Sequence, residues 1–244
     1  MKNGRNVNLK NIINSIYIKY VMKRERKNHP NPIKEWPHCV VSRKMGCDRG
    51  TPIDRYYIEK YLNLNKNYIT GNVMEIGDSM YTMKYGLNLE TSYIFTADLE
   101  YKSETSKVIY GDLQSGKGCE KEVVDCFILT QTLPFIYDIH SAAKNIVNML
   151  RSGGTAILTV SGVSMISEYD NSRWGHFWGF TETSLRKLFE DISQDISIEI
   201  TSMGNAKTAS AFLYGLSVED LEKADFDSQE DLVPLMIGAL IKKY

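Results

Sequence analysis

The stretch VMEIGDSMYT, residues 73–82, has the pattern of a buried strand that turns into a loop. Its first four residues are mostly apolar and indicate the strand, and Gly77 follows as a residue that lets the backbone turn tightly or approach a ligand. Loops that bind a pyrophosphate usually carry several glycines, whereas this loop has one and continues with Asp78. The stretch therefore predicts either a cofactor-binding loop of another kind or only a tight turn after a core strand.

Strands and helices alternate on both sides of this stretch. The run VVDCFILT, residues 123–130, is apolar enough for a strand buried on both faces of a sheet. Further strands are predicted at 92–97, 107–110, 155–160 and 196–202, helices at 51–65, 141–150, 183–191 and 207–214, and a last apolar run at 232–241. This alternation predicts an α/β fold with a doubly wound, mainly parallel sheet. The two last strands, separated by a short helix, are expected to pair antiparallel at the sheet edge.

The composition is that of an ordinary globular protein. The chain has 244 residues, of which 43% are hydrophobic and 24% charged, which suits one large domain or one domain with an added element. The formal net charge is −1, so we expect no nucleic-acid partner. No apolar run approaches the ~20 residues that span a bilayer, and the N-terminus lacks a signal-peptide core, so the expected location is cytoplasmic.

The first 27 residues carry eight Lys or Arg and one acid, Glu25. Apolar residues recur among them at helical spacing, which predicts a basic amphipathic helix. Such a helix either makes peripheral contact with an anionic membrane or a partner, or packs on its own domain with its basic face in water. Three prolines in HPNPIKEWP, residues 29–37, predict an extended connector. We expect an N-terminal helical extension and cap at 1–66 and a second domain at 67–244.

The four cysteines are far apart in the sequence and form no CxxC pair: Cys39, Cys47, Cys119 and Cys126. Zinc sites need closely spaced soft ligands, so we expect no metal site and no disulfide framework. Cys126 lies within VVDCFILT and is expected in the core.

Acidic residues accompany the ends of three predicted strands. Glu75 ends the first strand, Asp98 follows the second and Asp112 follows the third. Because open α/β sheets bind ligands beyond the carboxyl ends of their strands, these residues are expected to face one site. Asp98 suits the two ribose hydroxyls and Asp112 suits an adenine amine, with the backbone amides of Leu99 and Leu113 as partners for ring nitrogens. The alternatives are a helix N-cap for Asp98 and a turn for Asp112.

These residues favour a ligand with a cationic or zwitterionic tail. Asp78 would repel a pyrophosphate, whereas the sulfonium and ammonium groups of S-adenosylmethionine (SAM) would suit it, and Gly77 lets the backbone approach. Gln131, directly after the strand at 123–130, is a further cofactor-binding candidate. A nicotinamide dehydrogenase is disfavoured, because glycines are missing and no obvious catalytic Tyr–Lys pair is present.

The order EIG…ADL…GDL…DCFILTQTL…LRSGG…ILTV resembles the class I SAM-dependent methyltransferases over residues 70–203. The blocks SRKMGCDRGTPIDRYYIEKYL, QTLPFIYDIHSAAKNIVNMLRSGG and YDNSRWGHFWGFTETSLRKLF resemble a bacterial subgroup associated with glycosyltransferases of surface-polysaccharide synthesis. The resemblance implies a Rossmann-like, seven-stranded sheet with an antiparallel seventh strand. It also places Glu75 and Gly77 at the methionine end of SAM. The chain departs from the family at residues 77–79, which read GDS in place of GxG, and at the turn 151–154.

The resemblance further implies that N-terminal elements cover the SAM pocket and touch its carboxylate. The block CDRGTPIDRYY offers Arg49, Arg55 and Tyr57 for this role. The alternative is an Asp–Arg network that fixes the helix at 51–65 to the sheet, and both interpretations stay open.

The segment SGVSMISEYDNSRWGHFWGFT, residues 161–181, is too long for a simple connection and is expected to bind the acceptor. Trp174 and Trp178 are predicted to stack on sugar faces, and Arg173 to bind hydroxyls or phosphate. His176 titrates near neutrality and is the first candidate for a general base. The resemblance implies an acid at that place, and Asp170 is the second catalytic candidate. Alternatively, the aromatic residues only pack the loop and Arg173 pairs with Asp170.

Together these expectations describe a SAM-dependent methyltransferase that O-methylates a sugar in glycan or surface-polysaccharide synthesis, with a glycosyltransferase as a candidate partner. One alternative is a methyltransferase of another small-molecule or lipid-linked acceptor, served at the membrane by the basic helix. Another is a catalytically silent binding module in a glycan-assembly complex.

Overall fold

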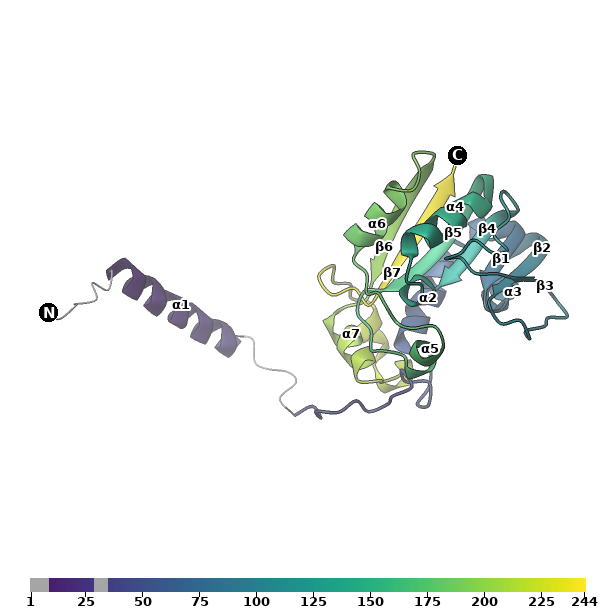
Figure 1. Cartoon of the computed structure of the whole chain (residues 1–244). Helices are drawn as coiled ribbons and strands as arrows, with labels where there is room; N and C mark the ends of the chain where they lie inside the picture. Colours follow the sequence, from purple (N-terminus) through teal and green to yellow (C-terminus); the bar gives the residue numbers. More distant parts are fainter. Residues whose placement is uncertain (1–8, 29–34) are drawn as a thin grey trace. The chain divides into compact units, whose positions relative to one another are not determined.

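The computed structural model describes residues 9–28 and 35–244 (Figure 1). Residues 1–8 and 29–34 lie outside the described residues, and with them much of the predicted connector. Contacts divide the chain into two units, Met1–Cys39 and Val40–Tyr244. Across the described ranges, no helix combines the length and the apolar character needed to cross a membrane.

Helix α1 (Leu9–Asn28) in the first unit confirms the predicted N-terminal helix but not its amphipathic pattern. Ile16 and Tyr20 share one side of the helix and are 63% and 64% exposed. Ile18 and Met22 are also exposed, and at 100° per residue they lie on the opposite side. Because apolar side chains occur on both sides, the prediction of a single apolar face is wrong for this part of the helix.

The second unit is built on a seven-stranded sheet. Its strands are β1 (Thr70–Ile76), β2 (Leu87–Thr96), β3 (Lys107–Tyr110), β4 (Val124–Thr130), β5 (Leu150–Ser161), β6 (Ile196–Met203) and β7 (Met236–Lys243). Their order across the sheet is β3-β2-β1-β4-β5-β7-β6. Strands β1 to β5 pair in parallel, whereas β7 is antiparallel to both β5 and β6. The predicted seven-stranded α/β sheet is confirmed as a mixed sheet, and the two last strands pair antiparallel as expected.

Helices cover both faces of this sheet (Figure 1). One core cluster packs under α4 (Ile139–Met149) and α6 (Glu182–Glu190). The other packs under α2 (Ile53–Leu64), α3 (Met80–Tyr85) and α7 (Ala206–Leu213). The remaining short helices are α5 (Glu168–Arg173), η1 (Lys66–Tyr68), η2 (Leu133–Phe135), η3 (Val218–Asp220) and η4 (Lys223–Phe226). Successive residues of β1 alternate between the clusters, which is the pleat of a strand covered on both faces.

Three local features differ from the predicted elements. The predicted turn at 151–154 forms the start of β5, where Gly153 has φ +81° and the β4–β5 register shifts. Helices α3 and α5 have six residues each, too few for a periodic signal, and were not predicted. Cys126 is fully buried in β4 as predicted, and the four thiols are free.

Helix α2 belongs to the core of the second unit. Its residues Tyr57, Tyr61 and Leu62 are buried in the same cluster as Val73 of β1 and Ile128 of β4. The domain division at residue 66 stays a prediction, and these contacts favour a boundary nearer residue 40.

Candidate functional site

A cleft of about 560 Å³ opens beyond the carboxyl ends of β1 to β4. This is the point where the strand order reverses, since β1 has β2 on one side and β4 on the other. The predicted site residues that line it are Gly77, Asp112, Leu113, Gln131, Asp170 and Trp174. The predicted residues outside its lining are Arg49, Arg55, Tyr57, Glu75, Asp78, Asp98, Leu99, Arg173, His176 and Trp178. The cleft therefore brings together the smaller part of the predicted set.

Glu75 organises the loop after β1. Its carboxylate is 2% exposed and accepts hydrogen bonds from the backbone N of Tyr81 at 3.1 Å and of Thr82 at 2.7 Å. These N–H groups belong to the first turn of α3, where no intrahelical acceptor exists. Burial raises the pKa of Glu75 to about 7, although the bonds from Thr82 and Tyr81 act in the opposite direction. Glu75 thus fixes the start of α3 beside Gly77, and its predicted contact with a cofactor stays a prediction.

Gly77 gives the cleft an open stretch of backbone. Its φ is +82°, and a Cβ added there would meet no atom within 4 Å. Its N donates to the carbonyl O of Phe95 at 3.0 Å, which ties the loop to β2. The next residue, Asp78, accepts a hydrogen bond from the backbone N of Met80 at 2.8 Å and so forms a turn.

Asp98 and Leu99 follow β2 at an exposed position. The Asp98 Oδ1 accepts from the backbone N of Glu100 at 2.9 Å, and Leu99 is 70% exposed. Thr96 and Ala97, directly before them, line the cleft. The predicted ribose and ring contacts therefore stay predictions for residues at the border of the cleft.

Asp112 lies in the cleft and is fixed by a turn. Its Oδ1 accepts from the N of Gln114 at 2.9 Å and its Oδ2 from the N of Ser115 at 3.2 Å. Partial burial raises the pKa of Asp112, but the bonds from Ser115 and Gln114 outweigh it and leave the pKa below its usual value. An ionised carboxylate therefore faces the cleft, next to the buried Leu113.

Gln131 brings an unpaired donor to the cleft. Its φ of +48° is unusual for a residue with a side chain. The side-chain Oε1 accepts from Ser161 Oγ at 2.7 Å, and the backbone N donates to the O of Thr159 at 2.9 Å. Its Nε2 is buried and has no hydrogen-bond partner in the described structure. Because a buried amide donor without a partner is costly, this atom favours a bound ligand that accepts its hydrogen bond.

The segment after β5 is fastened to the segment after β4. The N of Phe177 donates to the O of Pro134 at 2.8 Å, and the indole N of Trp178 donates to the O of Ile136 at 2.9 Å. The ring of Tyr137 meets that of Phe177 edge-on at 5.4 Å and stacks beside that of Trp178 at 6.3 Å. Phe177 and Tyr137 line the cleft, whereas Trp178 does not, so its predicted acceptor contact stays a prediction.

His176 lies beside the cleft. Its ring packs edge-on against Phe135, a lining residue, at 5.1 Å. Its Nδ1 is buried, and no described residue bonds to it. Burial lowers the pKa of His176, while the charge of Asp170 acts in the opposite direction. The neutral imidazole can accept a proton at neutral pH.

Asp170, Arg173 and Trp174 come from α5 and its C-terminal end. The Asp170 carboxylate accepts from Ser167 Oγ at 2.6 Å and lines the cleft, as does Trp174. The guanidinium of Arg173 lies 3.5 Å from the ring centroid of Tyr169 and so stacks on it. Arg173 therefore pairs with Tyr169 and not with Asp170, and its predicted acceptor contact stays a prediction.

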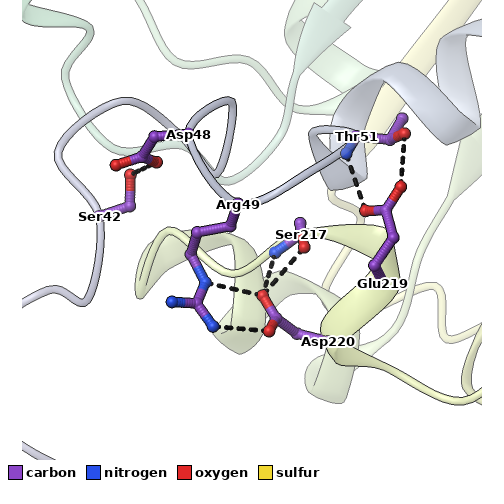
Figure 2. Close-up of polar contacts among 7 residues, drawn as sticks. All are labelled: Ser42, Asp48, Arg49, Thr51, Ser217, Glu219 and Asp220. Atoms are coloured by element: carbon purple, nitrogen blue, oxygen red, sulfur yellow. Dashed lines mark hydrogen bonds and ion pairs between the residues drawn. The ribbon is translucent and has the colours of Figure 1, made fainter.

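Arg49 takes part in a polar network with η3 (Figure 2). Its Nε and Nη2 donate to the two carboxylate oxygens of Asp220 at 2.8 and 2.6 Å. The same carboxylate accepts from the N and Oγ of Ser217, and Glu219 accepts from the N and Oγ1 of Thr51. This network joins the chain directly before α2 to η3 and not to the sheet, and the predicted contact of Arg49 with the SAM carboxylate stays a prediction.

Tyr57 is buried on the α2 side of the sheet. Its hydroxyl donates to Thr208 Oγ1 of α7 at 3.2 Å, and its ring packs on Phe226. Its predicted contact with the SAM carboxylate stays a prediction.

Sequence reasoning missed Tyr137 and Phe135 in the cleft lining. Both follow β4 in QTLPFIYD, so the rule that residues after strands form the site would have included them. Within the described parts of the chain, no group of three or more His, Cys, Asp or Glu side chains is placed to hold a metal ion.

No protein-family model matches the chain, and no curated protein matches it by sequence. Among solved structures, one similar chain comes from the complex of the Haloferax volcanii Trm112 methyltransferase activator with a protein provisionally named a methyltransferase. The TM-score is 0.51 at 13% identity over 78% of this chain and 93% of that chain. A protein from Galdieria sulphuraria, provisionally named a sarcosine dimethylglycine methyltransferase, gives 0.50 at 12% identity over 79% and 90%.

The chain has this methyltransferase fold. The fold alone does not fix the reaction, because the [4+2]-cyclase SpnF is equally similar, with a TM-score of 0.51 at 13% identity over 80% of this chain and 83% of that chain. Function must therefore be argued from the cleft itself.

Proposed function

We propose that the chain is a SAM-dependent methyltransferase that transfers a methyl group to a sugar hydroxyl. The observation that carries the proposal is the meeting of Gly77, Asp112 and Gln131 in one cleft beyond the strand ends. They come from three separate loops and offer an open backbone, a carboxylate and an unpaired amide donor. The fold, which the chain shares with two proteins provisionally named methyltransferases, is compatible with methyl transfer.

The lining of the cleft fits SAM better than a dinucleotide. The described residues that line it include no Lys or Arg, and its acidic side chains are Asp112 and Asp170. A pyrophosphate would be repelled there, whereas a sulfonium and an ammonium group would be attracted. The volume of about 560 Å³ suits a small-molecule site, and the open Gly77 backbone and the Gln131 Nε2 leave contacts for a ligand.

SAM, when bound, supplies an electrophilic methyl group, and the residues of the chain orient the acceptor and remove its proton. His176 is the proposed base, because its pKa is lowered and its Nδ1 is unpaired within the described residues. Asp170 is the proposed partner of the imidazolium that forms, because its negative charge favours the protonated ring. Alignment of the acceptor hydroxyl contributes much of the rate in such a displacement.

A sugar acceptor is favoured by the aromatic side chains that line the cleft. Trp174 is 48% exposed and Phe177 46% exposed, so both keep free surface for an acceptor. The proposal includes a role in glycan or surface-polysaccharide synthesis, with a glycosyltransferase as partner. The alternative hypothesis is a lipid-linked acceptor, and in that case the basic residues of α1 would contact the membrane.

Calorimetry with SAM and with S-adenosylhomocysteine (SAH) tests the proposal. Binding in the micromolar range is expected, and no binding at millimolar ligand would contradict it. Methyl-labelled SAM offered with a panel of saccharides then tests transfer. If SAM binds and no saccharide accepts the label, the sugar acceptor is contradicted, and either another acceptor or the catalytically silent binding module takes its place.

A further inference from the structure

Tyr137 and Phe177 form an aromatic corner in the lining of the cleft. Their ring centroids are 5.4 Å apart and their planes meet at 73°. Tyr137 is 68% exposed, although it is a large aromatic residue held within a folded segment. An aromatic face carries partial negative charge and is attracted to apolar C–H groups, such as those on the flat face of a sugar ring.

Contacts on the side away from the cleft hold this corner in place. The indole N of Trp178 donates to the O of Ile136 at 2.9 Å and to the O of Tyr137 at 3.2 Å. The ring of Trp178 stacks beside that of Tyr137 at an angle of 30°. The backbone N of Phe177 donates a hydrogen bond to the O of Pro134. Because the corner is held before a ligand arrives, little entropy is lost when a ring binds to it.

The charge of the lining sets a second condition on the acceptor. Asp112 and Asp170 are the acidic side chains among the described residues of the lining. Arg173 is the arginine nearest to Asp170 in the sequence, and its guanidinium is stacked on the ring of Tyr169. Even with the net positive charge that SAM carries, two carboxylates leave this lining negative. The binding affinity of a ligand with a phosphate group beside them is lowered roughly tenfold for each close pair of like charges.

We infer that the acceptor is an uncharged sugar unit that stacks on Tyr137 and Phe177, and that a sugar still attached to phosphate is excluded. This inference rests on the proposed methyl transfer and names its substrate class. In a nucleotide sugar the diphosphate is bonded to a ring carbon, so a ring seated on the corner would carry that charge into the acidic lining. A glycosyl transfer, or the removal of a phosphate, must therefore precede this reaction and supply its substrate.

Ligand-observed NMR on the full chain saturated with SAH tests the inference. The probes are the methyl glycosides of glucose, galactose, mannose and rhamnose, each beside the matching sugar 1-phosphate. At least one glycoside is expected to bind about tenfold more tightly than its phosphate. Equal or tighter binding of the phosphates, or no glycoside binding while SAH binds, would overturn the inference. Loss of SAH binding would instead count against the proposed function.

Variants separate the two parts of the inference. Tyr137→Ala should weaken glycoside binding at least fivefold, whereas Tyr137→Phe keeps the ring and the affinity. Tyr244→Ala is the matched control, because Tyr244 is 70% exposed and follows β7, which runs antiparallel to β5 and so ends at the end of the sheet opposite to the cleft. Asp170→Asn should raise the relative affinity for the sugar phosphate about tenfold. An unchanged ratio in Asp170→Asn, or equal losses in Tyr137→Ala and Tyr244→Ala, would contradict the assignment.

Discussion

Glu75 Oε2 accepts two hydrogen bonds from Thr82, one from its backbone N at 2.7 Å and one from its Oγ1 at 2.8 Å. A single oxygen of a buried side chain thus joins the end of β1 to the first turn of α3. The arrangement places an ionisable group under the loop that carries Gly77, so the stability of this loop depends on pH.

The pKa of Glu75 is raised to about 7 in the folded chain against 4.5 for an exposed glutamate. Between these values the folded state binds more protons than the unfolded state, so stability falls as the pH rises through this window. The loss amounts to up to about 3 kcal/mol. Urea unfolding at pH 5 and pH 8 measures this loss as a difference in the free energy of unfolding, and Glu75→Gln should reduce that difference. The same difference in both proteins would refute the assignment.

Gly77→Ala should weaken SAM binding about tenfold or more, because a Cβ at this position adds bulk to the open backbone of the cleft. Gly153→Ala is the matched control, since Gly153 has nearly the same φ and a Cβ there also meets nothing within 4 Å. Both variants should lose about 1 kcal/mol of stability from the left-handed backbone. Calorimetry and urea unfolding separate the effects, and equal SAM affinities in the two variants would count against the site.

Gln131→Glu should lower the affinity for SAH about tenfold, because the unpaired donor is replaced by acceptor oxygens. Ser161→Ala should cause a smaller loss, since it only frees the amide that Ser161 holds. Ser161→Thr keeps the hydroxyl and should restore binding. Calorimetry ranks the SAH affinities of the three variants. A larger loss of SAH affinity in Ser161→Ala than in Gln131→Glu would contradict the role of the amide.

His176→Ala should lower kcat by roughly 10²–10⁴ while SAM affinity stays within about twofold, because a general base acts on the acceptor and not on the cofactor. The lowered pKa of His176 predicts that the wild-type rate stays high until the pH falls below the usual range of histidine. Label transfer to the best glycoside, measured from pH 5 to pH 9, checks both points. A profile that is the same with and without His176 would exclude it as the base.

Asp220→Asn should loosen the segment before α2, because Asp220 binds both Arg49 and Ser217 (Figure 2). The pKa of Asp220 lies far below its usual value, chiefly because of the bonds from Arg49, so these contacts weaken when the pH falls through the acid range. Trypsin should cut this variant faster after Arg43 and Arg49. Asp191→Asn removes an exposed ion pair with Lys187 and should leave the cleavage rate unchanged.

The sequence predicts the sheet well because each strand has a strong local pattern. VVDCFILT is apolar apart from Asp125 and Thr130 and forms β4, and residues 236–241 of the predicted apolar run lie in the buried inner strand β7. The six-residue helices α3 and α5 could not be predicted from the sequence pattern. They are stabilised by specific hydrogen bonds, such as that between Glu75 and Thr82, and not by a periodic apolar face.

The predicted residues that follow strands divide into two groups: some line the cleft, whereas others, such as Asp98 and Leu99, lie outside its lining. Gly77, Asp112 and Gln131 reach the cleft because the topology carries them there. Whether a side chain such as Trp178 faces a cleft or supports its neighbour depends on one hydrogen bond to Ile136, which no spacing rule encodes.

Strand β7 lies between β5 and β6 although it follows both of them in the sequence. During synthesis, β6 therefore leaves the ribosome before the strand that joins it to the rest of the sheet exists. A nascent chain lacking residues 236–243 holds β5 and β6 with unpaired edges, which are sites for wrong pairing and aggregation. The emergence of residues 236–243 is thus the event that permits the sheet to close.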